Sequence, residues 1–158
     1  MFEVLAYVFE NYANASSALA LPALHRKLHQ MGFATEEIEH ALLWLEDMKQ
    51  AARQLGQAPQ RCAGRDLPSQ AMRVLTRKEQ KHLGLQSWGY LTYLQSIGVL
   101  TGERLELVLE RVLGVPGSPL PLADLKLVVL MVYWSRDEEP DALVLDELCD
   151  NDTDRVAH

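Results

Sequence analysis

Residues 21–55 read LPALHRKLHQMGFATEEIEHALLWLEDMKQAARQL, a pattern typical of two helices joined by a tight turn. Pro22 suits the first turn of a helix, and leucines follow it at helical spacing. Gly32 favours a left-handed stop, and Thr35 caps a second helix over 36–55. Helix, glycine turn and helix in this order form the helix-turn-helix pattern.

Further helices are predicted on both sides of this pair. Before it, residues 1–13 carry an apolar stripe at helical spacing: Phe2, Leu5, Val8, Phe9 and Tyr12. After it, Thr76 to Glu79 have capping-box spacing and begin a short helix that ends at Gly84. More helices are predicted at 85–97, 102–113 and 122–134, with a short terminal helix at 141–149.

The segment 122–134 is apolar nearly all round, which is typical of a buried central helix. A buried strand also fits its longest apolar run, the eight residues 127–134, but Asp124, Lys126 and the helical surroundings favour a helix. Crossing a bilayer takes about 20 apolar residues, and no basic leader precedes the apolar start. We therefore expect a cytoplasmic protein with no membrane partner.

Residues 56–70 contain two glycines and two prolines, which predicts a flexible loop. Residues 71–75 fit a short strand, and strand, threonine and helix in succession resemble the wing of a winged helix. We therefore expect a mainly α protein. It has a helix-turn-helix, winged-helix-like region over 1–83, a C-terminal helical bundle packed on it over 84–135, and a tail over 136–158.

Charge is distributed unevenly along the chain. The net charge of −7 arises within residues 136–158, which hold nine acidic and two basic residues, whereas residues 1–135 hold 13 of each. Within this neutral body, residues 61–90 carry six basic side chains and two acidic ones. The six are Arg61, Arg65, Arg73, Arg77, Lys78 and Lys81.

Motifs that carry chemistry are absent from the sequence. No phosphate-binding loop, dinucleotide fingerprint or GxSxG elbow occurs. Cys62 and Cys149 are too far apart for a CxxC motif, and Cys62 has no assignable histidine partner. His25 and His29 have the spacing of metal ligands but lack a third ligand and adjoin two basic residues. We expect no enzyme, no cofactor and no metal site.

Several ordered stretches resemble the bacterial Smg family. They are MFEVLAYVFENY at 1–12, ALLWLE at 41–46, MRVLT at 72–76, ERVL at 110–113, and DLK at 124–126 leading into VVLMV at 128–132. The resemblance implies a cytosolic bacterial protein of unassigned activity and supplies no catalytic or ligand residues. It also implies a link to DNA processing, because genes of this family often lie near those for a DNA-processing protein and a type I topoisomerase.

A protein-interaction module is the function we expect. A winged helix reads DNA with its third helix, here residues 36–55, but this helix carries five acids and two bases. We expect the partner to be another protein, with a DNA-processing factor as a candidate. Leu43 and Trp44 either pack on the C-terminal helices or offer this partner a hydrophobic anchor.

The alternative is a nucleic-acid-binding accessory protein that uses the basic segment 61–81. Its six basic residues would contact phosphates, and Trp88 and Tyr90 lie just beyond for base stacking. The tail adds a further hypothesis. Its apolar residues Leu143, Val144, Leu145 and Leu148 anchor it, and its acids either screen the basic segment or remain solvated.

Overall fold

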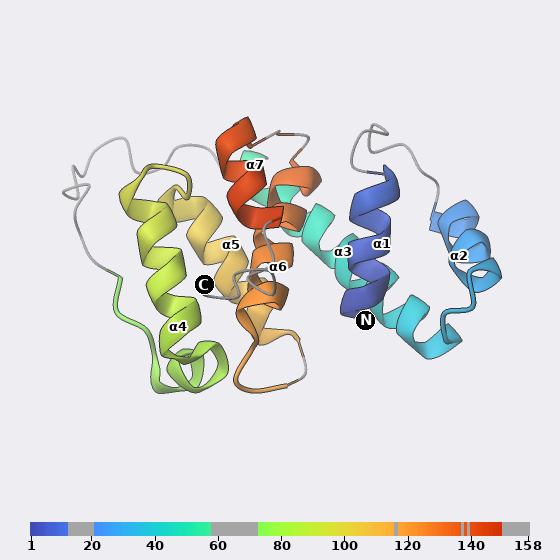
Figure 1. Ribbon diagram of the computed structural model, residues 1–158, viewed down its shortest axis with the longest axis horizontal. Helices are drawn as coiled ribbons and strands as arrows, with labels where there is room; N and C mark the ends of the chain where they lie inside the picture. The colour runs from blue at the N-terminus through green and yellow to red at the C-terminus, as the bar shows by residue number, and fades with distance from the viewer. Residues whose placement is uncertain (13–20, 58–72, 116, 137, 139, 150–158) are drawn as a thin grey trace, which may run out of the picture.

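The computed structural model describes residues 1–12, 21–57, 73–115, 117–136, 138 and 140–149, which form seven α-helices (Figure 1). They are α1 (Phe2–Tyr12), α2 (Leu21–Gln30), α3 (Thr35–Gln57), α4 (Arg77–Ser96), α5 (Gly102–Leu113), α6 (Leu122–Ser135) and α7 (Ala142–Cys149). No strand occurs among these described residues. The predicted all-helical class is therefore confirmed.

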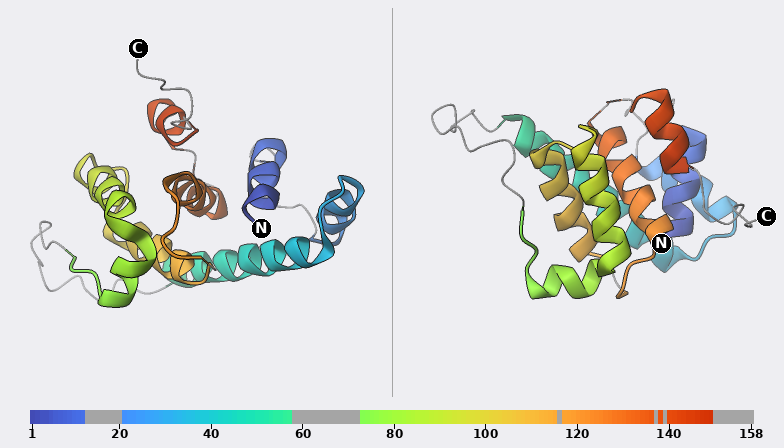
Figure 2. Two further views of the ribbon diagram at one scale, coloured as in Figure 1. Left: turned by 60° about the horizontal axis from the view of Figure 1, so that its bottom comes forward. Right: turned by 60° about the vertical axis from the view of Figure 1, so that its left-hand side comes forward.

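The long helix α3 forms one side of the molecule, and α1, α2, α5 and α6 pack against it (Figure 2). Helix α6 lies in the middle and also contacts α1, α4 and α5. Helix α7 packs on α6 on the side away from α3 (Figure 2). One continuous cluster of buried apolar side chains joins all seven of these helices.

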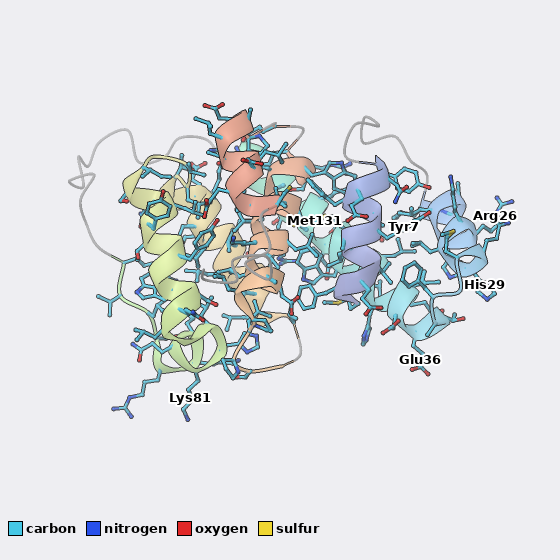
Figure 3. The ribbon with its side chains drawn as sticks, in the orientation of Figure 1. Tyr7, Arg26, His29, Glu36, Lys81 and Met131 are labelled. Atoms are coloured by element: carbon cyan, nitrogen blue, oxygen red, sulfur yellow. The ribbon has the colours of Figure 1, made fainter. Side chains whose placement is uncertain are left out.

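The central position of α6 follows from its sequence. Val128, Val129 and Met131 are fully buried, and Met131 lies in the middle of the molecule (Figure 3). Burying one such side chain contributes about 1.5–3 kcal/mol, so a helix that is apolar on every side is most stable when neighbours surround it. The predicted helix at 122–134 is confirmed, and the alternative strand is wrong.

The two helices and the glycine turn predicted for residues 21–55 are also present. Gly32 has a φ of 92°, a conformation that glycine adopts without steric cost. Next to it, the ring of Phe33 lies edge-on to that of Tyr7, with centroids 5.7 Å apart. The turn thus packs against α1 and fixes how α2 and α3 meet.

Helix α4 begins at a capping box and breaks at Gly84, as predicted. The Thr76 hydroxyl accepts a hydrogen bond from the backbone N–H of Glu79, and the Glu79 carboxylate accepts one from the N–H of Thr76. Gly84 has φ 73° and ψ 169°, which divides α4 into two helical segments. Beside the break, the backbone N–H of Leu120 donates to the carbonyl of His82 at 2.8 Å. The break lets the segment before α6 pack closely against α4.

The strand predicted as the wing of a winged helix is not found in the described residues. Residues 73–75, the described part of the predicted strand, are not in a strand, and Val74 is 83% exposed. Residues 71 and 72 and most of the predicted loop 56–70 lie outside the described residues, while α3 continues to Gln57. A wing needs paired strands, whereas the side chain of Arg73 holds this segment against α5 through Glu106.

Candidate protein-binding surface on α3

Leu43 and Trp44 are neighbours on α3 with opposite environments. Trp44 is 7% exposed, and its indole Nε1 donates a hydrogen bond of 3.4 Å to the carbonyl oxygen of Arg111 on α5. Leu43 is 60% exposed. Of the two predicted alternatives, packing on the C-terminal helices therefore applies to Trp44, whereas Leu43 lies on the surface.

Leu43 is the centre of what we call the acidic α3 face. The exposed residues that share its side of the helix are Glu36, Glu39, His40, Glu46, Asp47, Gln50, Arg53 and Gln54. The side chain of Glu36 projects into solvent at the start of α3 (Figure 3). Within the described parts of the chain, none of the four acids of this face forms an ion pair. An exposed leucine is therefore surrounded by unneutralised negative charge.

A hollow of about 280 Å³ adjoins the acidic α3 face. Its lining combines α3, α5 and the start of the chain: Met1, His40, Trp44, Asp47, Glu110, Arg111 and Gly114. The Nη2 of Arg111 donates to Glu110 Oε1 at 2.9 Å, whereas its buried Nε has no hydrogen-bond partner among the described residues. The hollow could receive one side chain of a partner next to Leu43.

The predicted nucleic-acid contact Arg73 is held by two carboxylates. Its Nη2 donates to Glu79 Oε1 and to Glu106 Oε2, each at 3.0 Å, and its Nη1 donates to Glu79 at 3.2 Å. The hydrogen bond from Arg73 lowers the pKa of Glu79 to about 2. Arg73 thus fastens the segment before α4 to α5, a structural role that occupies its guanidinium.

The other five predicted nucleic-acid contacts divide into two groups. Arg61 and Arg65 lie outside the described residues. Arg77, Lys78 and Lys81 are exposed on the first turns of α4, and Lys81 projects away from the body (Figure 3). Part of the basic segment is thus available at the surface.

Base stacking on Trp88 or Tyr90 is disfavoured by their surroundings. Both side chains are partly buried and pack against the hydrophobic core. Burial raises the pKa of Tyr90 to about 12, and its hydroxyl has no hydrogen-bond partner among the described residues. Each ring is thus engaged in core packing and only partly available to a base.

The metal and cysteine candidates gain no partners in the described structure. His25 is half-buried and His29 exposed on α2, and no cluster of three His, Cys, Asp or Glu side chains suited to a metal occurs within the described residues. Cys149 is exposed at the end of α7, and partial desolvation of its thiol, together with the charges of Asp146 and Glu10, raises its pKa. Cys62 lies outside the described residues. No described helix is both long and apolar enough to cross a bilayer.

The family profile described as "Protein of unknown function (DUF494)" matches residues 1–158. Three relatives, each named "Protein Smg homolog", come from Methylibium petroleiphilum, Leptothrix cholodnii and Bordetella petrii. They are 43%, 40% and 38% identical to this chain, and each alignment covers 100% of both proteins. The chain belongs to the Smg family. No solved structure gives a significant match.

Membership of the Smg family confirms the resemblance and extends it through residues 136–158, which the sequence motifs did not cover. The family names state no reaction or ligand, so functional inference depends on the geometry described above. From the sequence, four acids of α3 served only as an argument against DNA binding. They are Glu36, Glu39, Glu46 and Asp47. Their shared helical face with Leu43 was the signal that they form one surface.

Proposed function

We propose that this Smg-family protein is a non-enzymatic, cytosolic protein-interaction module whose acidic α3 face binds a basic, amphipathic segment of a partner. One observation carries the proposal: Leu43 is 60% exposed at the centre of a face whose acids have no ion-pair partners in the described chain. Hydrophobic anchors surrounded by complementary charge are a common arrangement of protein interfaces.

The two components of this surface would act differently. Burying the exposed part of Leu43 would contribute about 1–2 kcal/mol to binding. The acids would raise the association rate of a basic partner and make that rate dependent on salt. The hollow beside Leu43 offers room for a second side chain. A DNA-processing factor is the partner class to test first, because the resemblance to the Smg family implies that link.

The test is affinity capture from a bacterial lysate at several salt concentrations, with the wild-type chain, Leu43→Glu and Leu85→Glu. Leu85 is a matched control because it is 89% exposed but lies on α4, away from α3. We expect a stoichiometric partner that Leu85→Glu retains and Leu43→Glu loses. Recovery of the same proteins by all three chains, or of none by the wild type, would reject this role for α3.

Nucleic-acid binding is the second candidate. Arg77, Lys78 and Lys81 support it because they are exposed side by side and form no ion pair within the described residues. Three phosphate contacts give a salt slope of about −3 for duplex DNA, and correspondingly weak binding. Fluorescence anisotropy of a labelled oligonucleotide across a salt series tests it. A flat response at low salt rejects nucleic-acid binding, and loss of binding in Arg77→Glu/Lys81→Glu supports it.

A further inference from the structure

A groove of about 320 Å³ is lined by side chains of α1, α6 and α7. The ribbons of α1 and α7 both lie next to α6 (Figure 2). The apolar side chains that form it are Phe2, Ala6 and Phe9 of α1, Ala123, Leu127 and Leu130 of α6, and Leu148 of α7. We call this cavity the α1–α7 groove. Since α7 lies on the side of α6 away from α3, the groove is a separate surface from the acidic α3 face.

Helix α1 presents two apolar stripes rather than one. Val4, Leu5 and Val8 are buried in the core. Phe2 and Phe9 remain half-buried and line the groove, although the sequence pattern placed them in the same stripe as Leu5 and Val8. The second stripe therefore packs partly against the core and partly lines the groove.

Every charged residue that lines the groove is acidic. Glu3 and Glu10 lie on α1 and Asp124 on α6, and none forms an ion pair with another described residue. Burial raises the pKa of Asp124 and outweighs the opposing effect of the positively charged N-terminus of the chain. At the same groove the Cys149 thiol has its pKa raised by burial and by the charges of Asp146 and Glu10. The groove therefore combines an apolar floor with negative potential.

We propose that the α1–α7 groove binds an amphipathic helix of a partner protein that carries lysine or arginine along its edges. Its apolar stripe would pack against Phe2, Phe9 and Leu127, and its cations would pair with the acids. Glu3 and Glu10 are seven residues apart on one helix, a rise of about 10 Å, which matches basic residues two turns apart on a second helix. A negative rim would repel phosphates, so charge complementarity selects a basic segment over nucleic acid or an anionic lipid surface.

The probe is an 18-residue peptide of leucine and lysine arranged with helical period. Binding is followed by NMR of alanine methyl groups, because Ala6 and Ala123 line the groove whereas Ala41 and Ala52 are buried in α3. We expect saturable shifts of the Ala6 and Ala123 methyls and little change at the other two. A scrambled peptide, or one with glutamate in place of lysine, should shift neither the Ala6 nor the Ala123 methyl signal.

Charge reversal provides a second test of the same groove. Glu3→Lys/Glu10→Lys should raise the Kd measured from the Ala6 methyl by about tenfold at low salt. The matched control, Glu36→Lys/Glu39→Lys, reverses two acids on the acidic α3 face and should leave that Kd within about twofold. Failure of the peptide to shift Ala6 and Ala123, or equal effects of both double variants, would overturn the proposal. Because the Ala6 and Ala123 methyl groups line the groove and not the acidic α3 face, failure of this proposal is distinguishable from failure of the α3 proposal.

Discussion

Adjacent residues of this chain have unrelated roles because a helix turns about 100° per residue. Trp44 faces α5 and is almost fully buried, whereas Leu43 faces solvent. Helical periodicity places Leu43 opposite the core stripe of α3 and Trp44 on its flank, but it does not show which of the two another helix covers. The difference arises from α5, whose contact with α3 depends on residues more than sixty positions later in the chain.

The first prediction compares these neighbours directly. Trp44→Ala should lower the free energy of unfolding by about 3 kcal/mol or more, because it leaves a cavity and removes a hydrogen bond to α5. Leu43→Ala should change it by less than about 0.5 kcal/mol, as surface substitutions usually do. Urea unfolding followed by circular dichroism measures both. Equal destabilisation by the two changes would mean that Leu43 is also part of the core.

The second prediction concerns the acid sensitivity that Glu79 confers. Its pKa is lowered from 4.5 to about 2 by Arg73, so the folded state favours the carboxylate. A lowered pKa contributes stability that is complete above the unfolded value and is lost as the pH falls from about 4.5 toward 2. Glu79→Gln should cost about 2 kcal/mol at pH 7, because it removes charge-assisted hydrogen bonds to a partly buried group.

Thermal unfolding at several pH values checks the Glu79 prediction. The difference in stability between wild type and Glu79→Gln should shrink steadily below about pH 4.5 and vanish near pH 2. Glu110→Gln is the control, because Glu110 is exposed and pairs with its sequence neighbour Arg111. A pH-independent difference for Glu79→Gln would show that its ionisation is not coupled to folding.

At the scale of elements, the helices could be predicted because their signals are local. Apolar spacing, the capping box at Thr76 and the glycine at position 84 each act within about one or two helical turns. Such local signals could not exclude the predicted strand at 71–75, although its described residues 73–75 are not in a strand. Arg73 is held by Glu106, 33 residues later, and no local pattern indicates that pair.

The α1–α7 groove escaped prediction for a similar reason. Its walls come from α1, α6 and α7, so it exists only once the chain has folded. The sequence stripe of α1 correctly included Phe2 and Phe9, which pack against the core, but gave no sign that they also line a groove. The apolar anchor predicted for residues 143–148 also divides, with Leu148 buried at 2% exposure and Leu143 81% exposed.

The third prediction tests the break in α4. Gly84 has a φ of +73°, and a Cβ at this position would lie 3.4 Å from the Cβ of Pro119. Gly84→Ala should therefore destabilise the protein by about 1–2 kcal/mol through backbone strain. Gly89 is the matched control within the same helix, because an added Cβ there meets no atom within 4 Å. Gly89→Ala should stabilise the protein by about 0.5–1 kcal/mol. If Gly89→Ala instead destabilised the protein more than Gly84→Ala, the break at Gly84 would be contradicted.

The fourth prediction concerns how α7 is attached. Lys126 of α6 is buried, and its Nζ donates to the carbonyl oxygen of Glu147 at 3.0 Å and lies 5.3 Å from the centroid of the Tyr90 ring. This ammonium thus holds the C-terminal end of α7, where carbonyl groups lack helical partners. Lys126→Met should increase amide hydrogen exchange in α7 by about tenfold while leaving α3 unchanged. Equal exchange in wild type and variant would mean that apolar packing alone attaches α7.

At the scale of the whole molecule, charge is arranged around the fold rather than along the sequence. The acidic α3 face and the acidic α1–α7 groove lie on opposite sides of α6, and the exposed bases Arg77, Lys78 and Lys81 lie together at the start of α4. Separated acidic and basic surfaces produce local potentials of opposite sign on a body whose formal charge is neutral. The net charge of the sequence gives no indication of this separation.

Two acidic surfaces on opposite sides predict that the protein can hold two basic partners at once. The leucine–lysine peptide should bind with a stoichiometry of two per chain in isothermal titration calorimetry. Glu3→Lys/Glu10→Lys and Leu43→Glu/Glu36→Lys should each reduce this stoichiometry to one, without changing the affinity of the remaining site by more than about twofold. We expect such independence because no residue lines both the α1–α7 groove and the hollow beside the acidic α3 face. A stoichiometry of one in the wild type, or loss of both sites in either variant, would mean that the molecule does not join two partners.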